Sequence, residues 1–477
     1  MKKLEALTFL LIATAFISCA AADDEKQQVI SFLEMHKQRH TDLAMQLWDF
    51  AELGYMETRS SNLLKQHLAS SGFEVTSGVA DIPTAFVASY GEGSPVIGIL
   101  AEFDALPGIS QSATPTREIV DDKPNGHACG HHLFGACSTA AALALKEWMD
   151  DQDIKGTLRL YGTPAEEGGS GKVYMVRAGL FDDVDAVLHW HASDRNAANP
   201  STSLVNKSAR FTFTGISAHA AAAPHLGRSA LDGVESMNYM VNLMREHVLE
   251  KTRIHYVITR GGEAPNVVPD YAQVYYYVRH PDADTLLMIW DRVISVSEAA
   301  AKGTGTEVHA KVMHGNHSLL PNETLAKVMH ANLSMVGGVV YSEEEKEFAR
   351  RVSSSFLDAT NFSGLESKVL PMKMDNGQGS TDVGDVSWNV PTTGLRTATW
   401  VPGTASHSWQ AIAAGGYTIG AKGMQVAAKT LALTVIDLLR NPKLISTAKQ
   451  EFKDRRGHDF KYVPLLGDRN PPLDYRK

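Results

Sequence analysis

The order of strand-like and helix-like segments changes once along the chain, and this change constrains the fold most. Up to residue 191, buried strand-like runs alternate with helical runs, which predicts a sheet with helices on both faces. Between 207 and 314 the order becomes strand, helix, strand, strand, helix, strand, the order of a ferredoxin-like unit. We therefore predict an α/β protein in which a three-layer domain with a mixed sheet carries a small inserted α+β domain.

The predicted division of the chain follows from this pattern: an N-terminal leader at 1–22, a larger domain in two parts at 23–206 and 315–477, and an insert at 207–314. The regular segments that we expect are helices within 25–71, strands at 85–90 and 96–101, a helix at 132–149, strands at 157–161 and 184–190, a strand at 210–214, a helix at 230–249, strands at 254–259 and 272–279, a helix at 284–301, a strand at 306–313, and helices at 322–335, 342–356 and 416–440.

Composition excludes several classes of function. The chain has 477 residues, 44% of them hydrophobic, which is enough for two domains with a core each. Its net charge of −9 and the lack of a basic cluster argue against a nucleic-acid partner. Past the N-terminus no apolar stretch is long enough to span a bilayer.

The N-terminus has the pattern of an export signal. Lys2 and Lys3 precede an apolar run from 7 to 17, which is too short for a transmembrane helix and typical of a secretory signal. Two processing sites are open: the small residues 20–22 suit ordinary cleavage, whereas residues 16–19 resemble a bacterial lipobox in which Cys19 carries lipid. We expect an exported protein that is either periplasmic or anchored to the membrane through lipid.

A short turn at 126–132, Gly-His-Ala-Cys-Gly-His-His, concentrates side chains that bind metals. Cys129 and His131 lie two residues apart, an offset that suits a loop, and thiolate with imidazole is a typical ligand set for zinc and similar ions. The alternative is an ordinary buried cysteine beside partly exposed histidines.

The remaining cysteines bear on this choice. Once Cys19 is removed or lipidated, a disulfide between Cys129 and Cys137 is the simplest use of the other two. The helix expected at 132–149 places those two positions about 12 Å apart, whereas a disulfide needs Cα atoms under about 7 Å apart. We therefore expect Cys129 to be a free thiolate and Cys137 to be a core residue.

Two adjacent carboxylates follow the strand at 157–161. Glu166 and Glu167 lie at a strand end, the position where open α/β sheets build their sites. Neighbouring side chains on non-helical backbone point in different directions, so one carboxylate can bind metal while the other moves protons. A solvated acidic turn is the alternative.

Three further polar residues fall at comparable places. His191 follows the strand at 184–190, Asp104 follows the strand at 96–101, and His407 lies in a stretch rich in Gly, Pro and Ser. A capped core histidine is the alternative for His191. His407 is a candidate metal ligand only because the other residues together indicate a metal site.

The order of these motifs resembles that of the dinuclear metallo-amidohydrolases, a family that includes aminoacylases, hippurate hydrolases and auxin-conjugate hydrolases. Three longer strings, at 169–172, 224–232 and 380–388, are similar to the p-aminobenzoyl-glutamate hydrolase branch of that family. The motifs are Asp-Ala-Leu-Pro from Asp104, His-Ala-Cys-Gly-His from His127, Glu-Glu-Gly-Gly from Glu166, the strand-end His191, Gly-x-x-Ala-His-Ala around His219, Pro-Asn-Val-Val-Pro around Asn266, and His407.

The resemblance implies a centre of two divalent ions, manganese or zinc. Cys129 would bridge them, and Glu166 would be the general base. The implied ligands are Cys129, His131, Glu167, His191 and His407.

Other roles come from the same resemblance. Asp104 would orient His131, or it caps the turn before Pro107. His219 would reach the active site of a partner subunit to stabilise an oxyanion, while Asn266 and Arg279 would bind the carboxylate of the substrate. Capping, a turn or a surface charge are the structural alternatives for these last three. Residues 207–314 would then form a dimerisation or lid domain, and the rest the catalytic domain.

The function implied is that of a metal-dependent amidohydrolase that cleaves an N-acyl or N-aroyl amino acid, such as p-aminobenzoyl-glutamate. The alternatives are a metallo-dipeptidase and a non-catalytic exported protein that binds small carboxylated ligands. A homodimer is expected, and a heteromer of this chain with a similar one is the other possible assembly. Export departs from the pattern of the family, as does His132, where many relatives have Asp.

Overall fold

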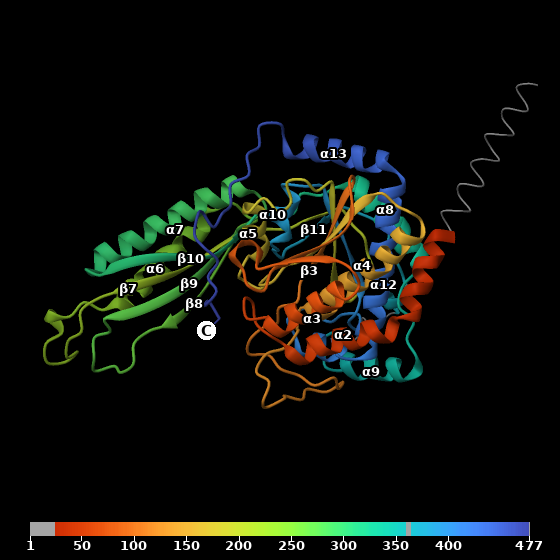
Figure 1. Ribbon diagram of the computed structural model, residues 1–477. Coiled ribbons are helices and arrows are strands. Elements are labelled where there is room, and N and C mark those ends of the chain that lie inside the picture. The colour runs from red at the N-terminus through yellow and green to blue at the C-terminus, as the bar shows by residue number, and fades with distance from the viewer. Residues whose placement is uncertain (1–23, 359–363, 477) are drawn as a thin grey trace, which may run out of the picture.

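The computed structural model describes residues 24–358 and 364–476 (Figure 1). The leader predicted at 1–22, with Cys19, lies outside the described residues. Two main sheets organise the chain, one of six strands and one of four. The mixed α/β architecture with an inserted α+β unit is confirmed. Among the described residues, no helix is both long and apolar enough to cross a membrane.

The large sheet is mixed, in the order β1-β2-β4-β3-β5-β12. Four neighbouring strands, β4, β3, β5 and β12, run parallel, while β2 is antiparallel to β4 and β1 is antiparallel to β2. The carboxyl ends of the four parallel strands therefore meet at one edge. The strands are β1 (Glu74–Ser77), β2 (Phe86–Glu92), β3 (Val96–Ala101), β4 (Gly156–Gly162), β5 (Ala186–Ser193) and β12 (Thr392–Ala398).

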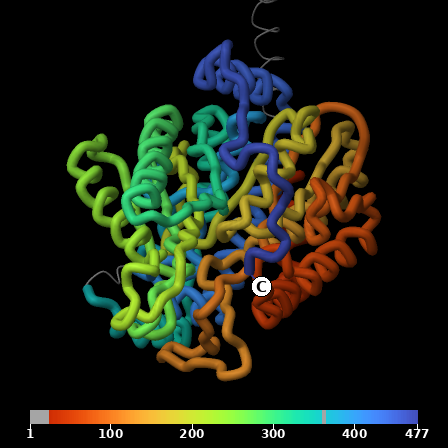
Figure 2. Tube along the Cα trace, turned by 90° about the vertical axis from the view of Figure 1, so that its left-hand side faces the viewer, coloured from red at the N-terminus to blue at the C-terminus, as the bar shows by residue number. Residues whose placement is uncertain are grey.

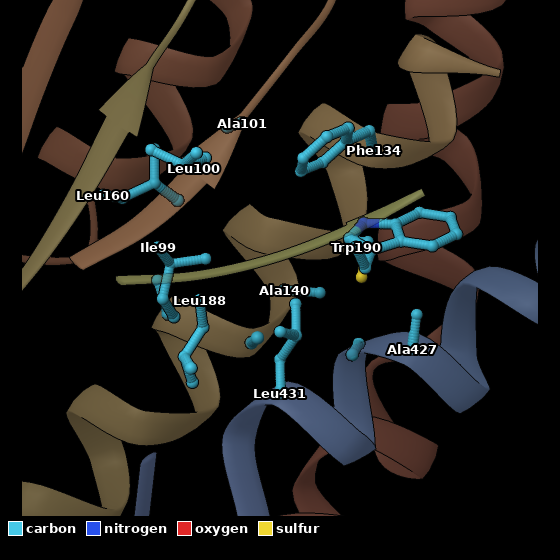
Figure 3. Packing of buried hydrophobic residues seen from close by; sticks show 14 of the residues in the cluster. Ile99, Leu100, Ala101, Phe134, Ala140, Leu160, Leu188, Trp190, Ala427 and Leu431 are labelled. Atoms are coloured by element: carbon cyan, nitrogen blue, oxygen red, sulfur yellow. The ribbon is translucent and has the colours of Figure 1, made fainter. Parts of the chain in front are cut away.

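Both faces of this sheet are covered, because every residue of β3 is buried. Figure 3 shows one face, where helices α4 (His131–Asp151) and α12 (Thr418–Arg440) pack against β3 and β5 through Ala140, Leu431 and Trp190. On the other face, Tyr161 of β4 stacks on Phe181 with ring centroids 4.4 Å apart. The three layers that the strand and helix alternation predicted are thus present.

The insert folds as a separate four-stranded sheet with its own core (Figure 1). The antiparallel order β10-β7-β9-β8 is that of a ferredoxin-like unit. Helices α6 and α7 cover one face, while the other face bears polar and aromatic side chains such as Arg210, Tyr275 and Arg279. The elements are β7 (Val205–Thr214), α6 (Ala230–Met244), β8 (Arg253–Arg260), β9 (Tyr271–His280), α7 (Ala283–Thr304) and β10 (Glu307–Asn316).

Several element boundaries differ from the expectation. The helical run expected within 25–71 is interrupted, because Ala51 adopts a left-handed conformation with φ of 40° and residues 51–57 leave the helix. Strand β5 continues past residue 190, since Ser193 still pairs with Ala398 of β12. The other helices are α2 (Lys37–Phe50), α3 (Thr58–Ala69), α5 (Gly171–Arg177), α8 (Glu323–Val336), α9 (Glu343–Ser353), α10 (Val383–Ser387) and α11 (Trp409–Gly415).

The chain continues well beyond the helix that was expected to be the last. Helix α13 (Pro442–Arg456) follows α12, and residues 457–476, which we call the C-terminal strap, then run back over the molecule. Figure 2 shows this blue segment descending from α13 across the other elements. The strap ends beside the edge where the parallel strands end.

Candidate metal centre

Polar side chains gather where the parallel strands of the large sheet end. A cleft of about 710 Å³ opens at this edge, which is the place where open α/β sheets bind ligands. The residues of the predicted centre come from four segments that are distant in the sequence, around 129–131, 166–167, 191 and 407, so the fold brings them together. The predicted residues that line the cleft are Cys129, Glu166, Glu167, His191, Arg279 and His407.

The turn at 126–132 leads directly into helix α4. Gly130 has φ of 81°, and a Cβ at this position would lie 2.4 Å from the Cβ of Ala192, so only glycine fits. This contact holds the turn against β5, where Cys129 Sγ lies 3.4 Å from His191 Nε2. His131 is the first residue of α4, not the loop residue that its spacing from Cys129 indicated. No disulfide forms, because Cys129 and Cys137 are both free.

Two groups of side chains could each hold one ion. One group is Cys129, His131 and His191, and the other is Cys129, Glu167 and His407; within each group the ligand atoms lie within 4.8 Å of one another. Cys129 belongs to both groups, which is the position of a bridging ligand. A third group joins His131 with Glu166 and Glu167.

The chemistry of this cluster fits divalent cations. His131 Nε2 lies 3.1 Å from Glu102 Oε2, and His407 Nε2 lies 3.1 Å from Glu167 Oε1, yet His131 Nε2 and both carboxylate atoms are buried without a hydrogen bond. A cation held between such donor atoms would satisfy them. The Cys129 sulfur, and then the Glu167 carboxylate, raise the pKa of His407 to about 11. The thiolate and the carboxylate that raise this pKa are themselves donors for a divalent cation.

A buried chain of charges fixes His131. Asp104 Oδ1 lies 3.0 Å from its Nδ1 atom, which is the contact expected of a residue that orients a ligand. Behind Glu102, the fully buried Lys172 Nζ lies 2.7 Å from Glu102 Oε1 and 2.7 Å from Asp382 Oδ1. A buried lysine needs such partners, since an unpaired charge there is strongly destabilising. Lys172 therefore holds Glu102 against the imidazole.

The two carboxylates lie on a strained segment, residues 164–170, which we call the carboxylate turn. Ala165 and Ser170 have φ of 58° and 60°, and Gly168 has φ of 89°. Left-handed backbone at residues other than glycine is unfavourable and persists only where the surroundings impose it. The strain here thus requires contacts from outside the turn.

Those contacts come from two segments that precede the turn in the chain. Glu57 Oε1 accepts a hydrogen bond from the Ala165 amide at 2.8 Å. Asp104 Oδ2 accepts one from the Glu167 amide at 2.9 Å, and the Tyr55 hydroxyl donates to the Gly169 carbonyl at 2.6 Å. Asp104 therefore orients both His131 and the turn, and it does so through separate oxygen atoms.

Glu166 differs from its neighbour in what surrounds it. Burial, and then repulsion from Glu102 and Glu167, raise the pKa of Glu166 well above its ordinary value. Glu167 has His407 as a partner, whereas among the described residues the Glu166 carboxylate has no hydrogen-bond donor. An unligated carboxylate with raised proton affinity has the properties of a general base.

The insert contributes unpaired polar groups to the same cleft. Arg279 of β9 lies over the Tyr277 ring at 5.3 Å, and its Nε atom is buried without a partner. Asn206 of β7 pairs with Arg279 in the strand register; it is 1% exposed, and both polar atoms of its side chain are unpaired. Arg279 was predicted from the sequence, whereas Asn206 was not.

His219 and Asn266 lie elsewhere, in the loops that join β7 to α6 and β8 to β9. These loops are at the end of the insert that points away from the large sheet (Figure 1, far left). His219 is exposed, and its Nδ1 accepts hydrogen bonds from the amides of Ala221 and Ala222. The Ala220 amide donates to the Asn266 carbonyl at 3.0 Å, so the two loops are held together. Neither residue lines the cleft of its own chain.

Sequence reasoning missed several residues that contact the site. Lys172 ends the string at 169–172, but its buried ion pairs depend on Asp382, more than 200 positions away. Tyr475 and Arg476 of the C-terminal strap both donate to the Glu167 carbonyl. Nothing in the local sequence of the strap indicates this contact.

Curated relatives span most of the chain. A p-aminobenzoyl-glutamate hydrolase subunit of Escherichia coli (strain K12) is 40% identical over 449 residues, covering 88% of this chain and 93% of its own. The Xaa-Arg dipeptidase of Mus musculus is 28% identical, covering 91% of this chain and 94% of its own.

Solved structures share the fold. An aminobenzoyl-glutamate utilization protein from Klebsiella pneumoniae matches with a TM-score of 0.60 at 17% identity, over 86% of this chain and 98% of that one. A dinuclear metal-binding peptidase of the M20 family from Bacillus subtilis matches with a TM-score of 0.55 at 19% identity, over 85% and 99%. The family model for peptidase family M20/M25/M40 matches residues 98–408. This match covers more than half of the chain, which therefore belongs to peptidase family M20/M25/M40.

Proposed function

We propose that this metal-dependent amidohydrolase cleaves the amide bond between an acyl or aroyl group and an amino acid. The observation that carries the proposal is the pair of ligand groups that share Cys129, with the Glu166 carboxylate beside them. p-Aminobenzoyl-glutamate is the first candidate substrate, because the relative that is 40% identical is named for its hydrolase. A turnover screen of the metal-loaded protein against N-acyl amino acids and dipeptides tests this choice directly.

The chain's own residues supply the proton transfers. Cys129, His131, Glu167, His191 and His407 would hold two divalent ions, which when bound polarise the scissile carbonyl and acidify the attacking water. Glu166 would take the proton of that water and pass it to the departing amine. Its raised pKa favours holding the proton between these two steps.

The mixed donor set supports zinc, since sulfur, imidazole nitrogen and carboxylate are its usual ligands. Manganese is the other ion that the family resemblance implied, and the Glu167 carboxylate is a donor of the kind it prefers. Metal analysis of the purified protein distinguishes the two.

The amine side of the substrate would carry a free carboxylate. Arg279 lines the cleft with its Nε unpaired, and an arginine fork matches a carboxylate in geometry and charge. Asn206, beside it in the strand register, offers an amide to the same group.

The two alternatives are weaker. The named dipeptidases are 28% identical to this chain, below the 40% of the p-aminobenzoyl-glutamate hydrolase relative. A protein that only binds its ligand has no use for an unligated carboxylate of raised proton affinity beside the ligand groups, and the family is one of hydrolases.

Export remains part of the proposal. The lysines and the apolar run at 7–17 support secretion to the periplasm or attachment through lipid at Cys19. The N-terminal residue of the mature protein distinguishes cleavage after residues 20–22 from processing at Cys19.

Exchange of each carboxylate for its amide separates the roles of the neighbouring glutamates. Glu166→Gln should retain bound metal while kcat falls by at least about 100-fold, the scale of a lost general base. Glu167→Gln should lose metal as well as activity. Metal analysis together with steady-state kinetics measures both, and the reverse pattern of metal loss would show that the assignments are exchanged.

The carboxylate-binding role has a matched control on the same open sheet face. Arg279→Ala should raise KM for carboxylated substrates about 10- to 100-fold, equivalent to about 1.5 to 3 kcal/mol. Arg210→Ala should leave KM unchanged, because Arg210 lies over Tyr275 and does not line the cleft. An equal effect of Arg279→Ala on a substrate whose carboxylate is amidated would contradict the role.

We also propose that the insert forms a homodimer in which His219 reaches the cleft of the partner. Its exposed position at the tip, away from the cleft of its own chain, supports this arrangement. The edge strand β8 also exposes Val257 and Ile258, and unpaired edges can join a second copy. A heteromer with a similar chain is the other assembly, because the relatives include two differently named kinds of p-aminobenzoyl-glutamate hydrolase subunit.

Mixing two inactive variants tests this assembly. His219→Ala and Glu166→Gln should complement each other, since one site of each hybrid dimer has both a normal base and a normal histidine. Activity should reach about a quarter of wild type after random exchange of subunits. If subunits are shown to exchange and activity does not return, His219 either acts within its own chain or has no role in catalysis.

A further inference from the structure

The C-terminal strap is held along its whole length. The Tyr462 hydroxyl donates to Asp385 Oδ1 at 2.7 Å, and Arg177 Nη1 donates to the carbonyls of Gly467 and Arg469, both at 2.8 Å. These bonds attach the strap to α10 and α5. It is therefore a fixed part of the fold.

The strap also crosses to the insert. Leu465 is buried in the core of the small sheet, and Arg469 Nη2 donates to the Met313 carbonyl of β10 at 2.6 Å. Its other terminal nitrogen donates to the Val312 carbonyl, and its Nε donates to the Tyr174 hydroxyl of α5 at 3.0 Å. One arginine thus joins the strap to both domains.

The end of the strap reaches the carboxylate turn. The Tyr475 hydroxyl and Arg476 Nη2 both donate to the Glu167 carbonyl, at 3.1 Å and 2.5 Å. The Tyr475 ring packs edge-on against Tyr55, with centroids 5.6 Å apart. A Cβ at Gly54 would lie 2.4 Å from the Tyr475 hydroxyl, so glycine there leaves room for this group.

We propose that Tyr475 and Arg476 are positioning residues that act through Glu167. Asp104 holds the amide of Glu167, while the strap holds its carbonyl, so the backbone of this residue is fixed on both sides. Because the turn contains strained residues, contacts from outside must keep Glu167 directed toward Cys129 and His407. Glu166 then points elsewhere and stays free of metal.

The strap lies outside the region that the family model matches. The family model matches residues 98–408, and the strap begins almost 50 positions later. The carboxylate turn lies inside the matched region, whereas the strap that contacts it lies outside. The inference rests on the proposed function only for its kinetic readout, because metal binding can be measured without any substrate.

The test uses full-length Tyr475→Phe, Arg476→Ala and the double variant. Titration of the apo-protein with Zn²⁺ or Mn²⁺ against a chromogenic chelator gives the metal affinity, which should fall about 10- to 100-fold, the usual effect of losing a partner that orients a ligand. The kcat of the loaded enzyme should fall on the same scale, with KM unchanged. Arg476→Lys, which can still donate to the carbonyl, should restore part of both.

Tyr462→Phe is the matched control, because it removes a strap hydroxyl of the same kind that bonds to Asp385 and not to the carboxylate turn. It should lower the melting temperature as much as Tyr475→Phe does and leave metal affinity and kcat unchanged. A double variant with normal metal affinity would overturn the proposal, and so would a rise in KM alone, which would make Arg476 a substrate contact. Wild-type protein that binds metal yet cleaves no amide would refute the proposed function and leave the metal test intact.

Discussion

The carboxylate turn at 164–170 is the constraint on which the rest of the site depends. Its left-handed residues give it no conformational preference of its own for this shape, so contacts from distant segments impose it. Tyr55, Glu57 and Asp104 hold it from the N-terminal side of the chain, and the strap holds it from the C-terminal end. This arrangement lets two adjacent carboxylates take opposite roles, because the backbone directs one toward the ligands and leaves the other free.

The remaining ligands are fixed by packing and by buried charge. Gly130 lets the turn of Cys129 approach β5 closely, which brings the thiolate within 3.4 Å of the His191 ring. Lys172 pairs with both Glu102 and Asp382 in the core, which offsets part of the negative charge that Glu102 brings beside His131. The same residues therefore stabilise the fold and position the metal ligands. A substitution in the buried charge chain changes the fold and the site together.

Local patterns in the sequence predicted the parts of the structure that local chemistry decides. The strand ends place Asp104, Glu166 and His191 at one edge because parallel strands share a direction, and the order of segments in the insert specifies its sheet. The interruption after α2 was missed, since the apolar spacing continues through it.

Contacts between distant segments could not be predicted in the same way. In the sequence, Asn206 looks like any other polar residue of a strand. Only its pairing with Arg279 in the strand register shows that it belongs to the cleft. The strap is polar and rich in proline, like many chain ends, and its role appears only where Tyr475 and Arg476 reach Glu167.

The central claim is a pair of cations bridged by the Cys129 thiolate. Anomalous diffraction from a crystal of the zinc- or manganese-loaded protein tests it most directly. We predict two metal peaks in each chain, both within about 2.3 Å of the Cys129 sulfur if the metal is zinc, one beside His131 and His191 and the other beside Glu167 and His407. A single peak, or two peaks that leave the Cys129 sulfur outside both coordination shells, would contradict it.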